Sequence, residues 1–197
     1  MFMPDQRWTL RDTVVMAVLG VVYGALYVGF VPVWGLLSGI IGPFALDLIY
    51  GVWFMASITA AYIIRKPGVA FTTEVLAALA EMPWGVAGAG ALIGGVMQGF
   101  ACEIPFALTR WRRYNTAVLI ASGMTASVFT MVHNWFLFGY NEFHVGMLMA
   151  MWAVRLLSGA LIAGIGGKAV ADGLAATGAL RSFPLGRERV RQQAGRA

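Results

Sequence analysis

The sequence predicts an all-α membrane protein, a polytopic bundle of six transmembrane helices with both termini in the cytoplasm. Hydrophobic residues make up 59% of its 197 residues and charged residues only 12%, whereas a soluble domain usually carries about 25% charged residues. Since each crossing needs roughly 20 apolar residues, the chain has room for six or seven helices and for no separate soluble module. We therefore expect a single membrane domain over residues 1–197.

Apolar runs predict the positions of the crossings. The first run carries no charge and ends where a Gly- and Pro-rich stretch, 31–43, is more typical of an outer loop than of a full span. The second ends at Arg65 and Lys66, and the third follows a Pro-Gly turn and ends at Pro83. The predicted helices and the tail that follows them are about 9–30, 44–64, 69–84, 89–111, 116–138 and 145–169, with a cytoplasmic tail over 170–197.

The last three predicted crossings are bounded by polar or glycine-rich segments. A Gly/Ala-rich outer turn, 85–88, precedes the fourth helix, which ends in the basic segment RWRRY, 110–114. The fifth runs into an outer polar cluster, 133–144. The sixth contains Arg155 and leads through Lys168 into the arginine-rich tail.

The lysine and arginine residues predict the orientation. Of the 14 in the chain, all but Arg155 lie at the N-terminus, at 65–66, at 110–113, or from Lys168 onward. Six crossings put these four places on one side of the membrane, and the three opposite loops contain none. Because cytoplasmic loops are enriched in Lys and Arg, we expect both termini to be cytoplasmic. No internal repeat is evident, which argues against an inverted-repeat transporter.

Two glutamates, Glu74 and Glu81, lie within the third predicted crossing, seven residues apart and so on one helix face. A carboxylate at membrane depth costs at least a few kcal/mol, and such residues usually face a bundle interior, a cavity or a ligand. The helical rise puts Glu81 roughly 21 Å from the cytoplasmic end of its helix, near the outer surface. Glu74 is deeper and either pairs with Arg155 or hydrogen-bonds to a neighbouring helix, and Glu103 has the same two interpretations.

Several aromatic and polar side chains reach the level of Glu81 in this topology. Carboxylates surrounded by Trp and Tyr suit an organic cation, through ion pairing and attraction to the ring faces. The two histidines are too few for a metal site, and Trp34 is interpreted as an interfacial residue. The candidate ligand-binding residues are Glu81, Asp47, Tyr50, Trp53, Trp84, Gln98, His133 and Asn134.

Four segments of the chain resemble one family: GPFALDLIYGVWF (42–54), IIRKPGVAFTTEVLAALAE (63–81), MQGFACE with TRWRRY (97–103 and 109–114), and RLLSGALIAGIGGKAV (155–170). Together they resemble the YkoE family, substrate-binding (S) components of energy-coupling factor (ECF) transporters assigned to thiamine or its hydroxymethylpyrimidine moiety. The resemblance covers residues 9–180, and the RKPG…E…E block is its most specific element. It implies a six-helix S component in a prokaryotic plasma membrane, with its substrate pocket toward the outer side.

The resemblance also implies partners, namely a transmembrane coupling subunit and two cytoplasmic ATPases. The chain has no GxxxxGK[ST] phosphate loop, so ATP is not expected to bind here, and no cofactor or metal is expected. Small residues on one face of the first helix, Ala17, Gly20 and Gly24, allow close approach of another backbone. By resemblance, that face would meet the coupling subunit.

Thiamine fits the predicted chemistry, because its thiazolium is a permanent cation and its aminopyrimidine offers a hydrogen-bonding edge and a stacking face. Carried over to this chain, the resemblance makes Glu81 the main polar anchor, Tyr50 and Trp53 the stacking partners, and Gln98 an orienting group. The pair His133-Asn134 departs from the family, where an acidic residue is expected, so the ligand contacts of the fifth helix are expected to differ.

Two other classes of protein were weighed. An ion-coupled secondary carrier would use Glu74, Glu81 and Glu103 as a proton relay. An intramembrane hydrolase would need a nucleophile beside a base, but Ser122 and His133 are eleven residues apart, about 16 Å along one helix. No GxS motif precedes that serine, so the hydrolase is the less favoured of the two.

Overall fold

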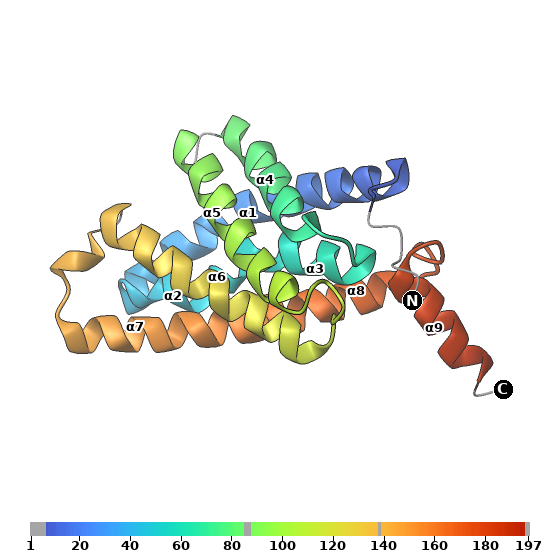
Figure 1. Cartoon of the computed structure of the whole chain (residues 1–197). Coiled ribbons are helices and arrows are strands. Elements are labelled where there is room, and N and C mark those ends of the chain that lie inside the picture. The colour runs from blue at the N-terminus through green and yellow to red at the C-terminus, as the bar shows by residue number, and fades with distance from the viewer. Residues whose placement is uncertain (1–6, 85–87, 138, 196–197) are drawn as a thin grey trace.

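The computed structural model describes residues 7–84, 88–137 and 139–195, and every regular element within them is helical (Figure 1). The all-α prediction is confirmed for these residues. Short 3₁₀ segments, η1 to η3, and a π-helical segment, η4, connect or interrupt the α-helices. In chain order the elements are α1 (Leu10–Ile41), α2 (Phe44–Ile49), η1 (Tyr50–Phe54), α3 (Met55–Ile64), α4 (Val69–Glu81), η2 (Met82–Trp84), α5 (Ala89–Leu108), α6 (Thr116–Leu137), η3 (Tyr140–Glu142), α7 (Val145–Ser158), η4 (Gly159–Gly166), α8 (Gly167–Ala176) and α9 (Pro184–Ala194).

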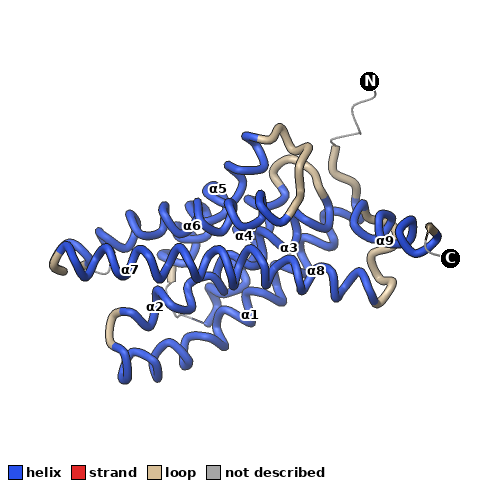
Figure 2. Tube along the Cα trace, turned by 90° about the horizontal axis from the view of Figure 1, so that it is seen from below, coloured by secondary structure: helices blue, strands red, loops and turns tan. Residues whose placement is uncertain are grey.

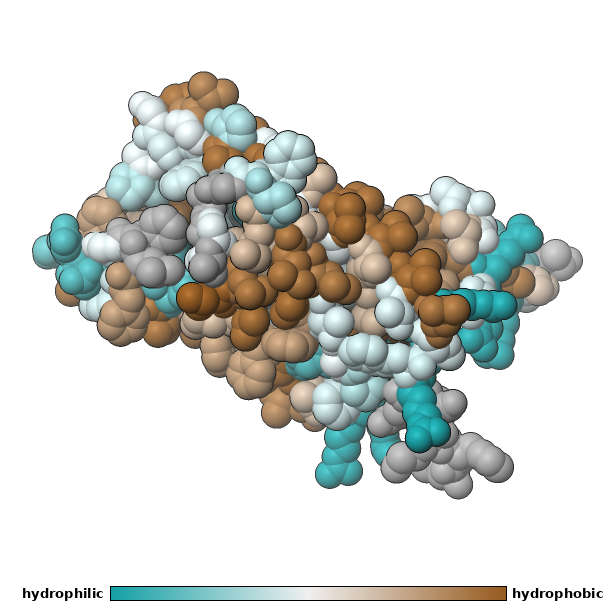
Figure 3. Space-filling model, turned by 90° about the horizontal axis from the view of Figure 1, so that it is seen from above, coloured by the Kyte–Doolittle hydropathy of each residue, from teal (hydrophilic) through white to brown (hydrophobic). Residues whose placement is uncertain are grey.

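Five helical stretches are long and apolar enough to cross a membrane: Leu10–Ile41, Phe44–Ile64, Gly90–Leu108, Thr116–Phe136 and Val145–Ala176. The remaining predicted crossing corresponds to α4, which has only 13 residues. Hydrophobic surface spreads across the middle of the molecule, and hydrophilic surface gathers toward its ends (Figure 3). The chain is therefore a multi-pass membrane protein, whose exposed apolar side chains suit contact with lipid.

Helix α4 lies between α1 and α5, and it also packs against α3 (Figures 1 and 2). Helix α5 packs in turn against α6, and α6 packs against η4. Both glutamates of α4, Glu74 and Glu81, are buried by these neighbours. Phe71 and Leu79 on the other face of α4 are 36% and 45% exposed, so the neighbouring helices cover the polar face of this short helix and leave apolar side chains outside.

The first helix is longer than predicted. It was expected to end near residue 30 and to lead into an outer loop over 31–43, but α1 continues to Ile41 with Pro32 inside it. Proline removes one backbone donor, yet lipid offers no partner for the many groups that a loop would expose. Continuing the helix satisfies most of them, and α1 ends only at Gly42, which has a positive φ of 61°.

Gly20 and Gly24 face the interior of the bundle, which corrects the prediction that they belong to a partner-binding face. A Cβ atom on Gly20 would lie 2.7 Å from the Cβ of Leu76, and one on Gly24 would lie 2.6 Å from the backbone oxygen of Ala77. These two glycines therefore let α1 approach α4 closely. Of the three small residues predicted to form that face, only Ala17 is exposed.

The second predicted crossing, 44–64, is divided by η1, and the last one is continuous through η4 to Ala176 rather than ending near 169. The two irregular segments pack against each other. Gly51 of η1 donates its backbone N–H to Ser158 Oγ at 2.9 Å, and a Cβ atom there would lie 2.3 Å from the Ser158 carbonyl oxygen. This close approach requires glycine and fixes the position of η1.

Ion pairs hold the basic segments together at one end of the molecule. Lys66 Nζ lies 2.7 Å from Asp12 at the start of α1, and Arg65 lies 2.8 Å from Glu188 in α9. Glu103 accepts hydrogen bonds from the backbone N–H of Gly68 at 2.8 Å and from Trp111 Nε1 at 2.6 Å. The role of Glu103 is thus to anchor the start of α4 and the basic loop.

The remaining helix boundaries agree with the predicted ones to within a few residues, except in the tail. The region 170–197, predicted as a polar tail, contains the end of α8 and the separate helix α9. Within the predicted outer turn, residues 85–87 lie outside the described residues, as does residue 138 at the predicted end of the fifth helix.

Candidate ligand-binding cavity

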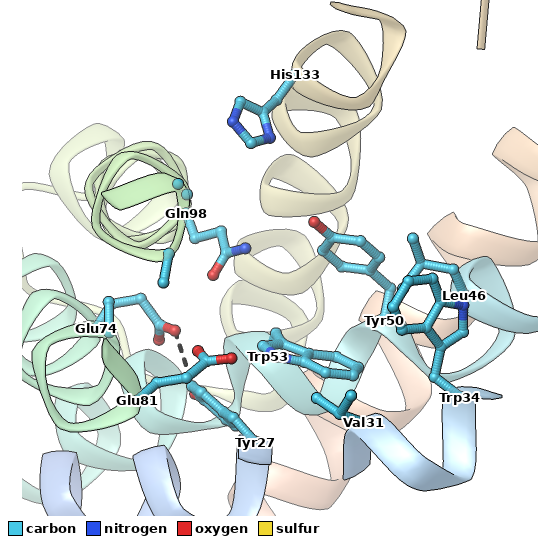
Figure 4. Close-up of a pocket in the computed structure, with 14 residues that line it drawn as sticks. Tyr27, Val31, Trp34, Leu46, Tyr50, Trp53, Glu74, Glu81, Gln98 and His133 are labelled. Carbon is cyan, nitrogen blue, oxygen red and sulfur yellow. Dashed lines mark hydrogen bonds between the residues drawn. The ribbon is translucent and has the colours of Figure 1, made fainter. Parts of the chain in front are cut away.

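A cavity of about 420 Å³ lies between α1, η1, α4, α5 and α6 (Figure 4). Its walls combine aromatic rings with three polar side chains from α4 and α5. Two of those side chains, Glu74 and Glu81, come from one face of α4, and the third, Gln98, from α5. The residues that line it are Tyr27, Val31, Trp34, Leu46, Tyr50, Trp53, Glu74, Ala78, Glu81, Gly90, Ala91, Gly94, Gln98 and His133.

Glu74 closes the cavity at one side and joins three helices. Its carboxylate accepts hydrogen bonds from Ser57 Oγ at 2.7 Å, from the Ser57 backbone N–H at 3.2 Å and from the Tyr27 hydroxyl at 3.2 Å. The same hydroxyl accepts from the backbone N–H of Ala56 at 3.2 Å. Of the two interpretations of Glu74, the hydrogen bond to a neighbouring helix is the one that the structure shows.

Glu81 and Gln98 complete the polar side of the cavity. Each is only 7% exposed, and in Figure 4 their polar ends point into the same space as the Glu74 carboxylate. Among the described residues, no lysine or arginine lies within ion-pair distance of Glu74 or Glu81. The cavity thus presents carboxylates without a protein cation to balance them.

Aromatic rings make up much of the remaining wall of the cavity. The ring of Trp53 lies 5.9 Å from that of Tyr50 and 6.2 Å from that of Tyr27, measured between centroids. All three rings line the cavity, as does the indole of Trp34. Such tilted aromatic clusters bury a flat ligand well, since they offer ring faces and edges over a large area.

His133 lies at the α6 side of the cavity (Figure 4). Both of its ring nitrogens are shielded from solvent, and neither has a hydrogen-bond partner in the described part of the chain. Buried polar atoms are normally paired, and an unpaired one in a pocket wall indicates a missing partner. A ligand with a donor or acceptor near α6 would supply it.

A buried ion pair, Asp47–Arg155, contacts the aromatic wall on the side away from the cavity. Arg155 and Asp47 are 1% and 0% exposed, and their charged atoms lie 2.5 Å apart. The Arg155 guanidinium carbon is 4.0 Å from the centre of the Tyr50 ring. Since Arg155 does not line the cavity, it holds Tyr50 from the side away from the ligand space.

Two neighbours complete the shell of Arg155. Its Nη2 donates to the Tyr140 hydroxyl at 3.2 Å, and that hydroxyl donates to Asp47 at 3.4 Å. Burial raises the pKa of Tyr140 to about 12, so the hydroxyl keeps the proton that it donates. With its amide oxygen turned toward the guanidinium, Asn134 accepts from Arg155 Nη2 at 2.7 Å.

The structure therefore divides the predicted site residues into two groups. Glu81, Tyr50, Trp53, Gln98 and His133 line the cavity. The other three do not line it, which corrects the prediction for each of them. Asp47 and Asn134 contact Arg155 instead. Trp84 lies on the surface beyond the end of α4, where it is 66% exposed.

Sequence reasoning missed Tyr27 and Trp34, and it left the role of Glu74 open. Trp34 was assigned to the membrane interface because it fell in the segment taken for a loop. The spacing Tyr23, Tyr27, four residues apart on the same face as Gly20 and Gly24, could have identified Tyr27 as inward-facing.

Comparison with known proteins agrees with this architecture. Residues 11–129 match a family described as the permease component of ABC-type cobalt transport systems. The protein YkoE of Bacillus subtilis (strain 168), which is named as a proposed HMP/thiamine permease, is 42% identical over 184 residues, 93% of this chain and 92% of YkoE. A crystal structure of an S component of an ECF transporter superposes with a TM-score of 0.92 at 40% identity, covering 96% of this chain and 98% of that one.

The helical membrane fold, the cavity and these similarities define an S component of an ECF transporter. Within that class, and within the broader permease family matched above, the chain belongs to the YkoE family. It is a transport protein and not an enzyme, so the hydrolase alternative is wrong. In keeping with this, the buried Ser122 hydroxyl donates to the backbone oxygen of Cys102 at 2.7 Å.

Proposed function

We propose that the cavity captures thiamine or its hydroxymethylpyrimidine moiety from the outer side of the membrane for ATP-driven uptake. The observation that carries the proposal is that two glutamates without an ion-pair partner among the described residues, Glu74 and Glu81, line one cavity together with aromatic rings. A cationic heterocycle satisfies both sides at once. The cavity of about 420 Å³ also falls within the range of small-molecule pockets, roughly 300–1,000 Å³.

The two rings of thiamine make different demands on such a cavity. A permanent thiazolium cation gains most beside a carboxylate and over an electron-rich ring. The Tyr50 ring already has the Arg155 guanidinium at 4.0 Å, which makes it a poor platform for a second cation. We therefore place the neutral aminopyrimidine against Tyr50, and the thiazolium between Glu81 and Trp53.

The polar groups near the pyrimidine position suit its hydrogen-bonding edge. Gln98 offers both a donor and an acceptor, and it points into the cavity from α5 (Figure 4). The unpaired nitrogens of His133 lie on the neighbouring helix α6. In this arrangement the pyrimidine alone makes most of the polar contacts, so the free hydroxymethylpyrimidine is a ligand of the same site.

The orientation in the membrane supports capture from outside. The basic segments around Arg65, Lys66 and Arg112 lie together at the end of the molecule that carries the start of α1 and α9 (Figure 1). By the distribution of positive charge, we propose that this end is cytoplasmic and that six helices cross the prokaryotic plasma membrane. Tyr140 and Glu142 then lie at the outer side, in the loop beyond α6.

Transport also requires partners, because the chain carries no nucleotide-binding loop. We propose that a coupling subunit and two ATPases complete the transporter, and that the coupling subunit contacts the exposed face of α1. That face carries Ala17 together with Val14, Val18 and Val21, which are 51–61% exposed. Gly20 and Gly24 take no part in it, since they pack against α4.

A proton-coupled carrier is less well supported by the geometry. The relay would need Glu103 beside the glutamates of α4, but Glu103 binds Gly68 and Trp111 at the basic end and does not line the cavity. Uptake that stops with an uncoupler while ATP is held constant would favour this alternative.

The proposal is tested by calorimetric titration of the purified chain with thiamine. Glu81→Gln keeps the shape of the side chain and removes its charge. An ion pair or charge-assisted hydrogen bond is worth roughly 1.5–3 kcal/mol, so thiamine affinity is expected to fall by at least about tenfold. Hydroxymethylpyrimidine, which lacks the cation, should lose less.

Glu142→Gln is the matched control, because Glu142 is exposed in η3 and does not line the cavity. It should leave both affinities unchanged. An unchanged thiamine dissociation constant in Glu81→Gln would show that the carboxylate has a structural role only.

A further inference from the structure

The basic end of the molecule contains a second concave site, separate from the ligand cavity. It has a volume of about 800 Å³ and lies between the RWRRY loop, the start of α6, and α3, α8 and α9. We call it the basic hollow. Its charged lining consists of Arg65, Arg112, Arg113, Lys168 and Glu188.

Two of these cations are left without an acidic partner. Arg65 lies 2.8 Å from Glu188, and Lys168 lies 2.5 Å from Asp172, so their charges are balanced. Arg112 and Arg113 form no ion pair within the described residues. The hollow therefore carries a local excess of positive charge from two adjacent guanidinium groups.

A hydroxyl group in the wall of the hollow also lacks a partner. The Tyr114 hydroxyl is shielded from solvent and has no hydrogen-bond partner among the described residues, while its ring stacks on Phe106 with centroids 5.3 Å apart. Burial raises the pKa of Tyr114, so the hydroxyl remains a donor. An unpaired buried donor in the wall of a hollow that Arg112 and Arg113 also line indicates a missing acceptor.

The start of α6 adds to the same preference. Asn115 and Thr116 line the hollow, and α6 begins at Thr116 and extends over 22 residues. The Asn115 side chain already accepts from the backbone N–H of Val118 at 3.1 Å, but the backbone N–H groups ahead of Val118 and the helix dipole favour anions, phosphate in particular. Guanidinium groups, a phenolic donor and a helix N-terminus are together a set of donors for a phosphate group.

We propose that the basic hollow binds the phosphate headgroup of an anionic phospholipid. The hollow lies at the end of membrane-spanning helices, where headgroups are found, and its lining includes Trp111, Tyr62 and Tyr114, aromatic residues typical of that depth. Leu108, 80% exposed at the end of α5, offers apolar surface next to the loop for an acyl chain. Basic pockets at the cytoplasmic ends of helices bind anionic lipids in this way.

The test is native mass spectrometry of the detergent-purified chain, titrated with phosphatidylglycerol and with phosphatidylcholine of the same acyl chains. Wild-type protein is expected to bind phosphatidylglycerol at least tenfold more tightly. The double variant Arg112→Gln/Arg113→Gln should lose most of this preference. Equal binding of the two lipids by the wild-type chain would overturn the proposal.

A charge-matched control separates the hollow from a general effect of charge. Arg110 and Arg181 are exposed and do not line the hollow, so Arg110→Gln/Arg181→Gln removes the same charge elsewhere. It should keep the lipid preference within about twofold of wild type. An equal loss in both double variants would contradict a defined site.

Tyr114→Phe tests the hydrogen bond without changing the charge. It removes only the unpaired hydroxyl, so the fold should be retained while phosphatidylglycerol binding weakens threefold or more. Full retention of binding would exclude the hydroxyl as a phosphate ligand. Inorganic phosphate is added as a competitor, and its displacement of the lipid at equal concentration would assign the hollow to a free anion instead.

Discussion

Replacing Asp47 by alanine is expected to destabilise the protein strongly, although Asp47 does not touch the ligand cavity. Asp47 and Arg155 are 0% and 1% exposed, and their charged atoms lie 2.5 Å apart. Removal of one partner leaves the other as an uncompensated buried charge, which typically costs about 3–5 kcal/mol. At about 2–4 °C per kcal/mol for a chain of this size, the thermal midpoint in detergent should fall by roughly 6–20 °C.

The control for this experiment is an exposed ion pair in the same chain. Lys168 and Asp172 also lie 2.5 Å apart, but their side chains are 29% and 36% exposed. Asp172→Asn should therefore cost less than about 1 kcal/mol. Thermal unfolding followed by tryptophan fluorescence measures both variants, and a shift in Asp47→Ala no larger than that in Asp172→Asn would refute the reasoning.

A double variant separates stability from ligand binding. Asp47→Leu/Arg155→Met removes both charges, and replacing a whole buried pair by apolar residues is often neutral or stabilising. The thermal midpoint should recover toward wild type. Thiamine affinity should not, because Tyr50 loses the guanidinium that lies 4.0 Å from its ring. Recovery of both would show that Arg155 has no part in positioning the aromatic wall.

Two further predictions concern helix packing and orientation. Gly24→Ala should lower both stability and the thiamine affinity measured by calorimetry, because its Cβ would lie 2.6 Å from a backbone oxygen of α4, the helix that carries Glu81. The control is Gly29→Ala, whose Cβ would meet no atom within 4 Å. It should leave stability and affinity unchanged. Cysteine at the exposed position Asn141 should react with an impermeant thiol reagent added outside intact cells, while cysteine at the exposed position Arg112 should not. Wild-type thiamine affinity in Gly24→Ala would contradict the tight packing of α1 against α4. Labelling of the cysteine at position 112 from outside would contradict the proposed topology.

Apolar runs predicted most of the helical segments, because backbone groups in lipid must be paired within helices. The main failure was α1. Pro32 and several glycines suggested a loop, as they would in a soluble protein. In a membrane the need to pair backbone groups outweighs that local preference, so the helix continued to Ile41.

The depth of the candidate site residues along the membrane-spanning helices could be predicted from the sequence, but the direction in which each side chain points could not. The predicted topology placed Glu81, Tyr50 and Trp53 at one level and Gln98 a little deeper, and all of them line the cavity. Asp47 shares that level but points to Arg155. Its direction relative to Tyr50 depends on the change from α-helix to 3₁₀ helix at η1, which alters the angle between successive side chains and leaves no clear signal in the sequence.

The irregular segments show the same limit. The long π-helical segment Gly159–Gly166 and its close contact with Gly51 depend on two helices that are distant in sequence meeting backbone to backbone. The sequence contains these glycines but does not indicate which residues they contact. Helix propensity describes each segment alone, whereas these contacts are set by tertiary packing.

The position of thiamine in a co-crystal structure tests the central claim most directly. The account predicts a single molecule in the cavity, with its thiazolium between Glu81 and Trp53 and its aminopyrimidine against Tyr50. Thiamine bound at another site, or an empty cavity at saturating thiamine, would contradict it.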